Sequence, residues 1–101
     1  MSTLVDPRDR EAIVHLLAPL ARRHRARLCL FGSRARGDAR RASDIDIALV
    51  GAQPIPLDEL ALAREALEDS CIPFRVDLVD YARAPAGLRQ SIDREGIEWS
   101  V

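Results

Sequence analysis

The spacing of apolar positions predicts that helices and strands alternate along the chain. The first element is an amphipathic helix from residue 7 to about residue 24, whose apolar side chains recur three and four positions apart: Ile13, Leu16, Leu17 and Leu20. An aspartate that can cap the helix and a proline suited to its first turn stand directly before this pattern. Pro19 lies inside the pattern, and we expect it to kink or fray the helix because proline lacks a backbone N–H.

Three short apolar segments predict strands. They cover residues 28–31, 44–50 and 75–80. In the second and third segments apolar and acidic side chains alternate, and successive side chains of a strand point to opposite faces. Each of these two strands is therefore expected to have one apolar face and one face that carries carboxylates.

Helices are expected between and after the strands. The sequence predicts a short helix over residues 33–38, a longer one over residues 57–70 and a last helix over residues 86–95, followed by a short edge strand at residues 97–99. This alternation predicts an α/β (α+β) fold in which helices cover a small mixed β-sheet. The chain has 101 residues and shows no linker or repeat, so we expect residues 1–101 to form a single domain.

Composition excludes several classes of protein. The charges nearly cancel, with 15 basic and 16 acidic residues, and 48% of the residues are hydrophobic, which is typical of a folded soluble domain. No apolar segment approaches the length of a membrane span, and the first residues lack the pattern of a signal peptide. Cys29 and Cys71 fit neither a zinc nor a redox spacing. We therefore expect a cytoplasmic protein that does not bind membranes.

The charges are nevertheless unevenly distributed. All basic residues are arginine, and residues 22–41 hold eight of them against one aspartate, whereas residues 44–101 hold five against twelve acidic residues. This pattern suits either an ordinary solvated surface or a site that binds phosphate with arginines and a metal with carboxylates. The basic segment lacks interleaved aromatic side chains, so direct binding of nucleic acid is not expected.

Two aspartates on the second predicted strand provide the first chemical signal. Asp44 and Asp46 are two positions apart, so their carboxylates share one face and repel each other. A divalent cation would remove this repulsion, and Mg²⁺ favours carboxylates together with phosphates and water. Asp77 can join the pair if the two strands are neighbours, and three such carboxylates can hold two metal ions for displacement at phosphorus. Alternatively, Asp44 only caps a turn and Asp46 is an exposed strand residue.

A glycine–serine turn precedes this strand. Gly32 and Ser33 lie where an apolar strand ends and a short helix begins, and the free N–H groups of such a turn can bind a phosphate. Arg34 and Arg36 follow, and each guanidinium can bind phosphate oxygens through two hydrogen bonds. A Gly-Ser pair alone is usually just a turn, but the aspartate pair that follows makes the combination specific.

Together these residues resemble a known motif. The segments 32–37 and 43–46, followed by Asp77, are similar to the motif of minimal nucleotidyltransferase (MNT) domains in the DNA polymerase β superfamily. The resemblance implies the polymerase β-like nucleotidyltransferase fold. It also implies that Ser33 and its backbone hold a nucleoside triphosphate, that the aspartate pair binds magnesium ions, and that Asp77 completes the metal site and helps to deprotonate the acceptor hydroxyl.

The same resemblance implies a biological role. MNT proteins of this size resemble antitoxins encoded beside a HEPN-domain ribonuclease toxin, which they silence by transferring AMP from ATP to one of its tyrosines. This role implies ATP as substrate, two Mg²⁺ ions and a hetero-oligomer with the HEPN toxin. Two alternatives stay open: an antitoxin that neutralises its partner by binding alone, and a subunit of a transferase that modifies small molecules such as antibiotics.

Overall fold

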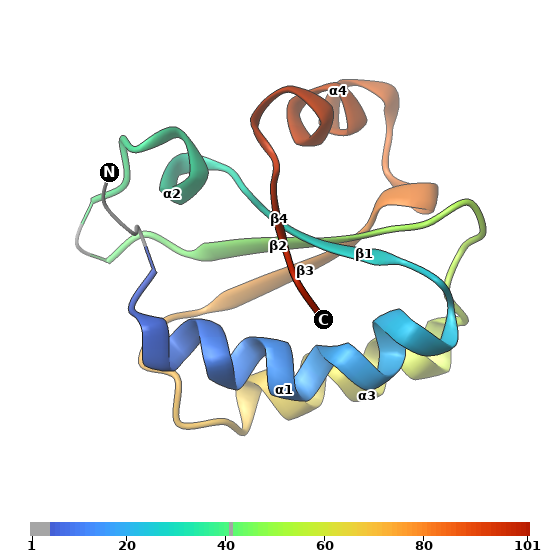
Figure 1. The fold of residues 1–101 in the computed structure, drawn as a ribbon, viewed down its shortest axis with the longest axis horizontal. Coiled ribbons are helices and arrows are strands. Elements are labelled where there is room, and N and C mark those ends of the chain that lie inside the picture. Colours follow the sequence, from blue (N-terminus) through green and yellow to red (C-terminus); the bar gives the residue numbers. More distant parts are fainter. Residues whose placement is uncertain (1–4, 41) are drawn as a thin grey trace.

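The computed structural model describes residues 5–40 and 42–101, which form a four-stranded sheet with helices on both faces (Figure 1). All the predicted helices and strands are present, and a short 3₁₀ helix, η1, follows the third strand. The elements in chain order are α1 (Pro7–Arg23), β1 (Arg27–Phe31), α2 (Ser33–Arg36), β2 (Ile45–Val50), α3 (Leu57–Glu68), β3 (Val76–Asp80), η1 (Tyr81–Arg83), α4 (Ala86–Glu95) and β4 (Ile97–Trp99). The expectation of a small mixed sheet covered by helices is confirmed.

The strand order is β3-β2-β1-β4. β1 runs antiparallel to both β2 and β4, whereas β2 and β3 are parallel and are connected through α3, as a parallel pair requires a long crossover. The C-terminal end of β1 therefore lies beside the N-terminal ends of β2 and β3. This end of the sheet carries the residues that the sequence analysis selected.

The first helix begins and ends close to the predicted positions. The Asp6 carboxylate accepts a hydrogen bond from the Arg8 N–H at 2.8 Å, and Pro7 is the first helical residue. The helix does not end at Pro19 but continues to Arg23. Pro19 is exposed, so water can satisfy the carbonyl that its missing N–H leaves without a partner.

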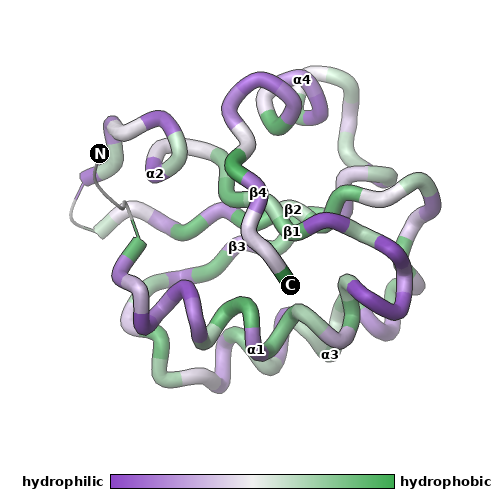
Figure 2. Tube along the Cα trace, in the orientation of Figure 1, coloured by the Kyte–Doolittle hydropathy of each residue, from purple (hydrophilic) through white to green (hydrophobic). Residues whose placement is uncertain are grey.

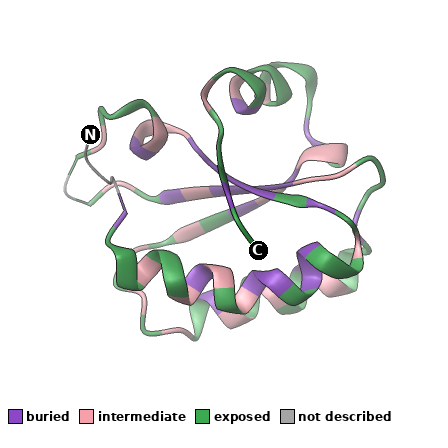
Figure 3. Cartoon of the chain, viewed as in Figure 1, coloured by how far each residue is buried: buried purple, intermediate pink, exposed green. Residues whose placement is uncertain are grey.

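The two faces of the sheet hold two separate apolar clusters. The larger one lies between the sheet and α1 and α3, and its strand residues Ile45, Ile47 and Leu49 are fully buried. The smaller one lies on the opposite face, where Ile92 of α4 packs against Phe31 and Ala48 of the sheet. Figure 3 shows the buried residues concentrated in the strands and along α1, and Figure 2 shows that hydrophobic residues follow the central strands.

Helix α1 is the longest helix, and many of its residues are charged. Within residues 5–40 and 42–101, no helix combines the length and the apolar character needed to cross a bilayer.

Candidate active site

The predicted site residues meet at the end of the sheet where β1 leads into α2. Phe31, the last residue of β1, lies opposite Asp46 in the antiparallel register, and Asp46 lies opposite Asp77 in the parallel register of β2 and β3. Adjacent strands are about 5 Å apart. Strands β2 and β3 are therefore neighbours, as the predicted role of Asp77 requires.

Asp46 and Asp77 belong to the face that α4 covers only in part. Ala48 and Val79 follow them by two positions on their strands, share this face and pack in the cluster under α4. The aspartates lie beyond this cluster, so Asp46 is half-buried and Asp77 is exposed. Asp44 directly precedes β2 and is also exposed. One face thus has a packed half and a half open to solvent.

Gly32 brings the backbone of the turn into contact with Asp46. Its φ of +79° lies in the region that side chains rarely adopt, and a Cβ at this position would overlap the Asp46 carboxylate. Ser33 follows as the first residue of α2 and is half-buried. A residue with a side chain at position 32 would push the turn away from the carboxylates.

Burial and the neighbouring carboxylates raise the pKa of Asp46 to about 6. Burial of the side chain is the largest cause, repulsion from Asp77 and then from Asp44 adds to it, and attraction by Arg36 opposes it. A bound cation would relieve this repulsion between the carboxylates.

The donor set suits a magnesium ion that arrives with a nucleotide. In the described part of the chain, no group of three or more acidic, histidine or cysteine side chains could hold a metal ion as placed. Mg²⁺ seldom depends on such a group, because it is usually bound by one or two carboxylates and completes its shell with water and substrate phosphates. Asp46 and its neighbour in register, Asp77, are oxygen donors of this kind.

The placement of Arg34 differs from the prediction that it binds phosphate. The residue is only 8% exposed, and its guanidinium donates to the Ser43 carbonyl oxygen at 2.7 and 3.1 Å and to the Asp44 carbonyl oxygen at 3.3 Å. It also lies over the Phe74 ring, 4.5 Å from the centroid. Arg34 therefore holds the backbone that carries Asp44. Sequence could not show this, because carbonyl and phosphate oxygens are both good acceptors for a guanidinium.

Arg36 lies at the exposed end of α2 between two carboxylates. Its Nε donates to Asp38 at 3.2 Å, and its Nη1 donates to the two carboxylate oxygens of Glu95 at 3.0 and 3.2 Å. The hydrogen bonds to Asp38 and then to Glu95 raise the pKa of Arg36 above its ordinary value. Arg36 thus places a guanidinium beside the turn, and its contact with phosphate stays a prediction.

Glu95 belongs to the same cluster, although no sequence motif indicated it. Besides its contact with Arg36, its Oε1 accepts a hydrogen bond from the Gly32 N–H at 3.0 Å. The sequence contains one weak signal, a glutamate in the last turn of a helix, where the helix dipole disfavours negative charge.

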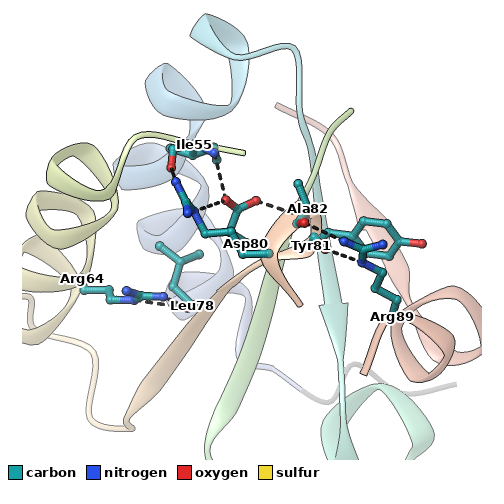
Figure 4. Close-up of polar contacts among 8 residues, drawn as sticks. Ile55, Arg64, Leu78, Asp80, Tyr81, Ala82 and Arg89 are labelled. Carbon is teal, nitrogen blue, oxygen red and sulfur yellow. Dashed lines mark hydrogen bonds and ion pairs between the residues drawn. The ribbon is translucent and has the colours of Figure 1, made fainter. Parts of the chain in front are cut away.

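Asp80, the other aspartate of β3, has a structural role on the opposite face. It is 4% exposed and accepts hydrogen bonds from the backbone N–H groups of Ile55 at 2.8 Å and Ala82 at 3.2 Å (Figure 4). Arg83 pairs with it at 3.3 Å. Because three positions separate it from Asp77, the two carboxylates point to opposite sides of the strand. Asp80 thus joins the loop before α3 to the start of η1.

Comparison with known proteins agrees with this arrangement. A family model described as polymerase beta, nucleotidyltransferase matches residues 20–98. A curated protein of Haemophilus influenzae (strain ATCC 51907 / DSM 11121 / KW20 / Rd), "Probable protein adenylyltransferase MntA", is 37% identical over 62 residues, which are 61% of this chain and 54% of that protein. The match thus spans about half the length of this curated relative.

Two solved structures are also similar. One, a toxin–antitoxin with AMP-PNP, shares 31% identity with a TM-score of 0.63, over 86% of this chain and 73% of the matched chain. The other, a tri-AMPylated Shewanella oneidensis HEPN toxin in complex with MNT antitoxin, shares 28% identity with a TM-score of 0.63, over 92% and 71%. Since the family match extends over most of the sequence and the fold agrees, this chain belongs to the polymerase β nucleotidyltransferase family.

Proposed function

We propose that this protein is a magnesium-dependent adenylyltransferase that transfers AMP from ATP to a tyrosine of a HEPN-domain toxin and thereby acts as its antitoxin. One observation carries the proposal: the Gly32–Ser33 turn contacts Asp46, which lies in register with Asp77 on an open part of the sheet. Membership of the nucleotidyltransferase family and the similarity to MntA support the reaction type.

The turn and Arg36 would hold the triphosphate. The backbone of Gly32 can approach a phosphate closely because it has no side chain, and Ser33 adds a hydroxyl and an N–H. Arg36 would add its guanidinium beside the turn, where Asp38 and Glu95 hold it. A similar toxin–antitoxin was solved with AMP-PNP, which supports an adenosine triphosphate as the nucleotide.

The carboxylates would hold the metal and receive the proton. Mg²⁺ held by Asp44, Asp46 and Asp77 would neutralise charge on the triphosphate and lower the pKa of the attacking hydroxyl. Asp77 is exposed on the edge strand β3, so an acceptor hydroxyl can approach it from solvent and transfer its proton there. The hydroxyl oxygen forms a bond to the α-phosphorus, and the bond to the departing pyrophosphate breaks.

The acceptor would be a second protein. The similar complex contains a HEPN toxin that is tri-AMPylated and an MNT antitoxin, which supports a HEPN partner that accepts AMP and a hetero-oligomer for this chain. Because the reaction consumes ATP, we place it in the cytoplasm. In this proposal Arg34 acts through the backbone of Ser43 and Asp44.

The direct test is the intact mass of the neighbour-encoded HEPN partner after incubation with this protein, Mg²⁺ and ATP. We expect one or more additions of an AMP unit with the natural protein, and none after chelation by EDTA or with the double variant Asp44→Ala/Asp46→Ala. The control is Asp69→Ala, which removes an exposed aspartate at the end of α3 and should leave the additions unchanged.

Two outcomes would contradict the proposal. A partner that keeps its mass but is bound and neutralised would identify an antitoxin that acts by binding alone. Transfer to small hydroxyl compounds with none to the partner would identify a small-molecule nucleotidyltransferase. Transfer by the double variant would instead contradict the assignment of the metal-binding carboxylates.

A further inference from the structure

The last residue of α4, Glu95, directs its carboxylate toward the glycine–serine turn. Its side chain is only 11% exposed. Its Oε1 accepts from the Gly32 N–H at 3.0 Å, and both of its oxygens accept from Arg36 Nη1 at 3.0 and 3.2 Å. The carboxylate thus connects the C-terminal helix to a segment about 60 positions earlier in the chain.

A glutamate at this position destabilises helix α4 itself. A carboxylate in the last turn faces the negative end of the helix dipole. Glu68 stands at the same position in α3, but it is exposed, and its side chain has no hydrogen bond in the described part of the chain. Glu95 differs because a backbone N–H and a guanidinium donate to it, and hydrogen bonds that involve charged groups are roughly twice as strong as neutral ones.

The two donors lie at opposite ends of α2. Gly32 directly precedes the helix, and Arg36 is its last residue. A helix of four residues is too short to be stable on its own, because nucleation costs more than its few hydrogen bonds return. The backbone leaves α2 at Gly37 in the left-handed conformation, with a φ of +88°. Contacts from outside must therefore order this segment, and Glu95 contacts both of its ends.

We infer that Glu95 is a positioning residue, which fixes the Gly32–Ser33 turn and the Arg36 guanidinium relative to each other so that both act on one triphosphate. The effect on the nucleotide rests on the proposed function, whereas the ordering of the turn does not. If Glu95 instead occupied the place of a phosphate, its removal would strengthen nucleotide binding. Whether removal of Glu95 weakens or strengthens nucleotide binding therefore separates the two roles.

The ordering of the turn is tested without nucleotide. We expect Glu95→Ala to accelerate hydrogen exchange of the amides in residues 32–37 at least about tenfold, because an acceptor of the Gly32 N–H and one of the two carboxylate partners of Arg36 are lost. Exchange in α3 should not change. Glu68→Ala is the matched control, since it removes a glutamate from the same position of another helix. Unchanged exchange in residues 32–37 would overturn the inference.

The effect on the site is tested by calorimetric titration with AMP-PNP and Mg²⁺. We expect Glu95→Ala to raise the Kd about tenfold and Glu95→Gln to raise it less, because the amide oxygen still accepts from Gly32. In an Arg36→Ala background, Glu95→Ala should weaken binding by a smaller factor, since the two residues act together. Glu95→Gln keeps the size of the side chain and carries the test if the alanine variant does not fold.

Failure of the positioning role and failure of the proposed function give different results. An unchanged or lower Kd for Glu95→Ala overturns the positioning role while the proposed function stands. If the natural protein does not bind AMP-PNP, the proposed nucleotide site and the effect of Glu95 on it are both overturned. The exchange measurement then still decides whether Glu95 orders the turn.

Discussion

The two faces of the sheet are built from alternate residues of the same strands, yet they have different roles. Toward α1 and α3, Ile45 and Ile47 are fully buried in a continuous apolar cluster. Toward α2 and α4, Asp46 and Asp77 lie beyond a small cluster and remain in contact with solvent. Residues 46 and 47 are neighbours in the chain but belong to opposite faces. Substitutions one position apart should therefore separate chemistry from stability.

The largest effect is expected on the open face. Asp46→Asn should lower AMP transfer to the partner about 1,000-fold, because it removes the carboxylate that contacts the turn and faces Asp77 in register. Intact mass of the partner over time measures the rate, and circular dichroism checks the fold. Asp69→Asn is the control. Transfer within tenfold of the natural rate would show that the open face does not carry the reaction.

The adjacent substitution should have the converse effect. Ile47→Ala should lower the free energy of unfolding by about 2–5 kcal/mol, because it leaves a cavity at a fully buried position. The transfer rate per folded molecule should be unchanged. Urea denaturation measures the stability, and Leu62→Ala, at an exposed leucine, should change it by less than about 0.5 kcal/mol. A large loss of transfer in the folded fraction would contradict the separation of the faces.

A second pair of substitutions tests the comparison within one strand. Asp80→Asn should cost about 1–3 kcal/mol of stability, because buried hydrogen bonds to Ile55 and Ala82 and an ion pair are weakened. Asp77→Asn should cost little stability but lower AMP transfer, since Asp77 is exposed beside Asp46. Thermal unfolding and the transfer assay are measured on both variants. Equal stability of the two would contradict the assignment of Asp80.

A smaller effect is expected from a substitution that disturbs the loop carrying Asp44. Arg34→Lys should raise the Mg²⁺ concentration for half-maximal transfer about tenfold, because lysine cannot bind the Ser43 and Asp44 carbonyl groups through a planar fork. Arg64→Lys is the matched control, since Arg64 also donates two hydrogen bonds to one backbone carbonyl, that of Leu78 (Figure 4). The same shift in both variants would show that the effect is not specific to the Asp44 loop.

The smallest effect concerns the pH dependence of stability without metal. The pKa of Asp46 is about 6 in the folded protein and about 4 when unfolded, so the ionised carboxylate destabilises the fold above pH 6. This penalty disappears as the pH falls toward about 4. In EDTA near pH 7, Asp46→Asn should therefore raise the Tm, with no increase near pH 4. A lower Tm of the variant near pH 7 would contradict a net penalty for the ionised Asp46 carboxylate in the fold.

The local pattern of apolar, proline and glycine residues predicted most of the helices and strands. Helix α4 covers the predicted residues 86–95, because a proline precedes it and Gly96 ends it. The alternation along β2 and β3 correctly assigned their apolar faces, since side chains in a strand alternate whatever lies around it. The helix η1 was missed because it depends on Asp80 accepting from the Ala82 N–H after the strand has ended.

The amino-acid sequence alone is enough to show which residues are charged and which face of its strand each one occupies. Which of these charges meet depends on the folded protein: Asp46 with Asp77 through the parallel register, Arg34 with the carbonyls before β2, and Glu95 with Gly32 and Arg36. The periods of helices and strands follow from the local backbone, whereas a hydrogen bond across some 60 residues exists only after the sheet and its helices have packed.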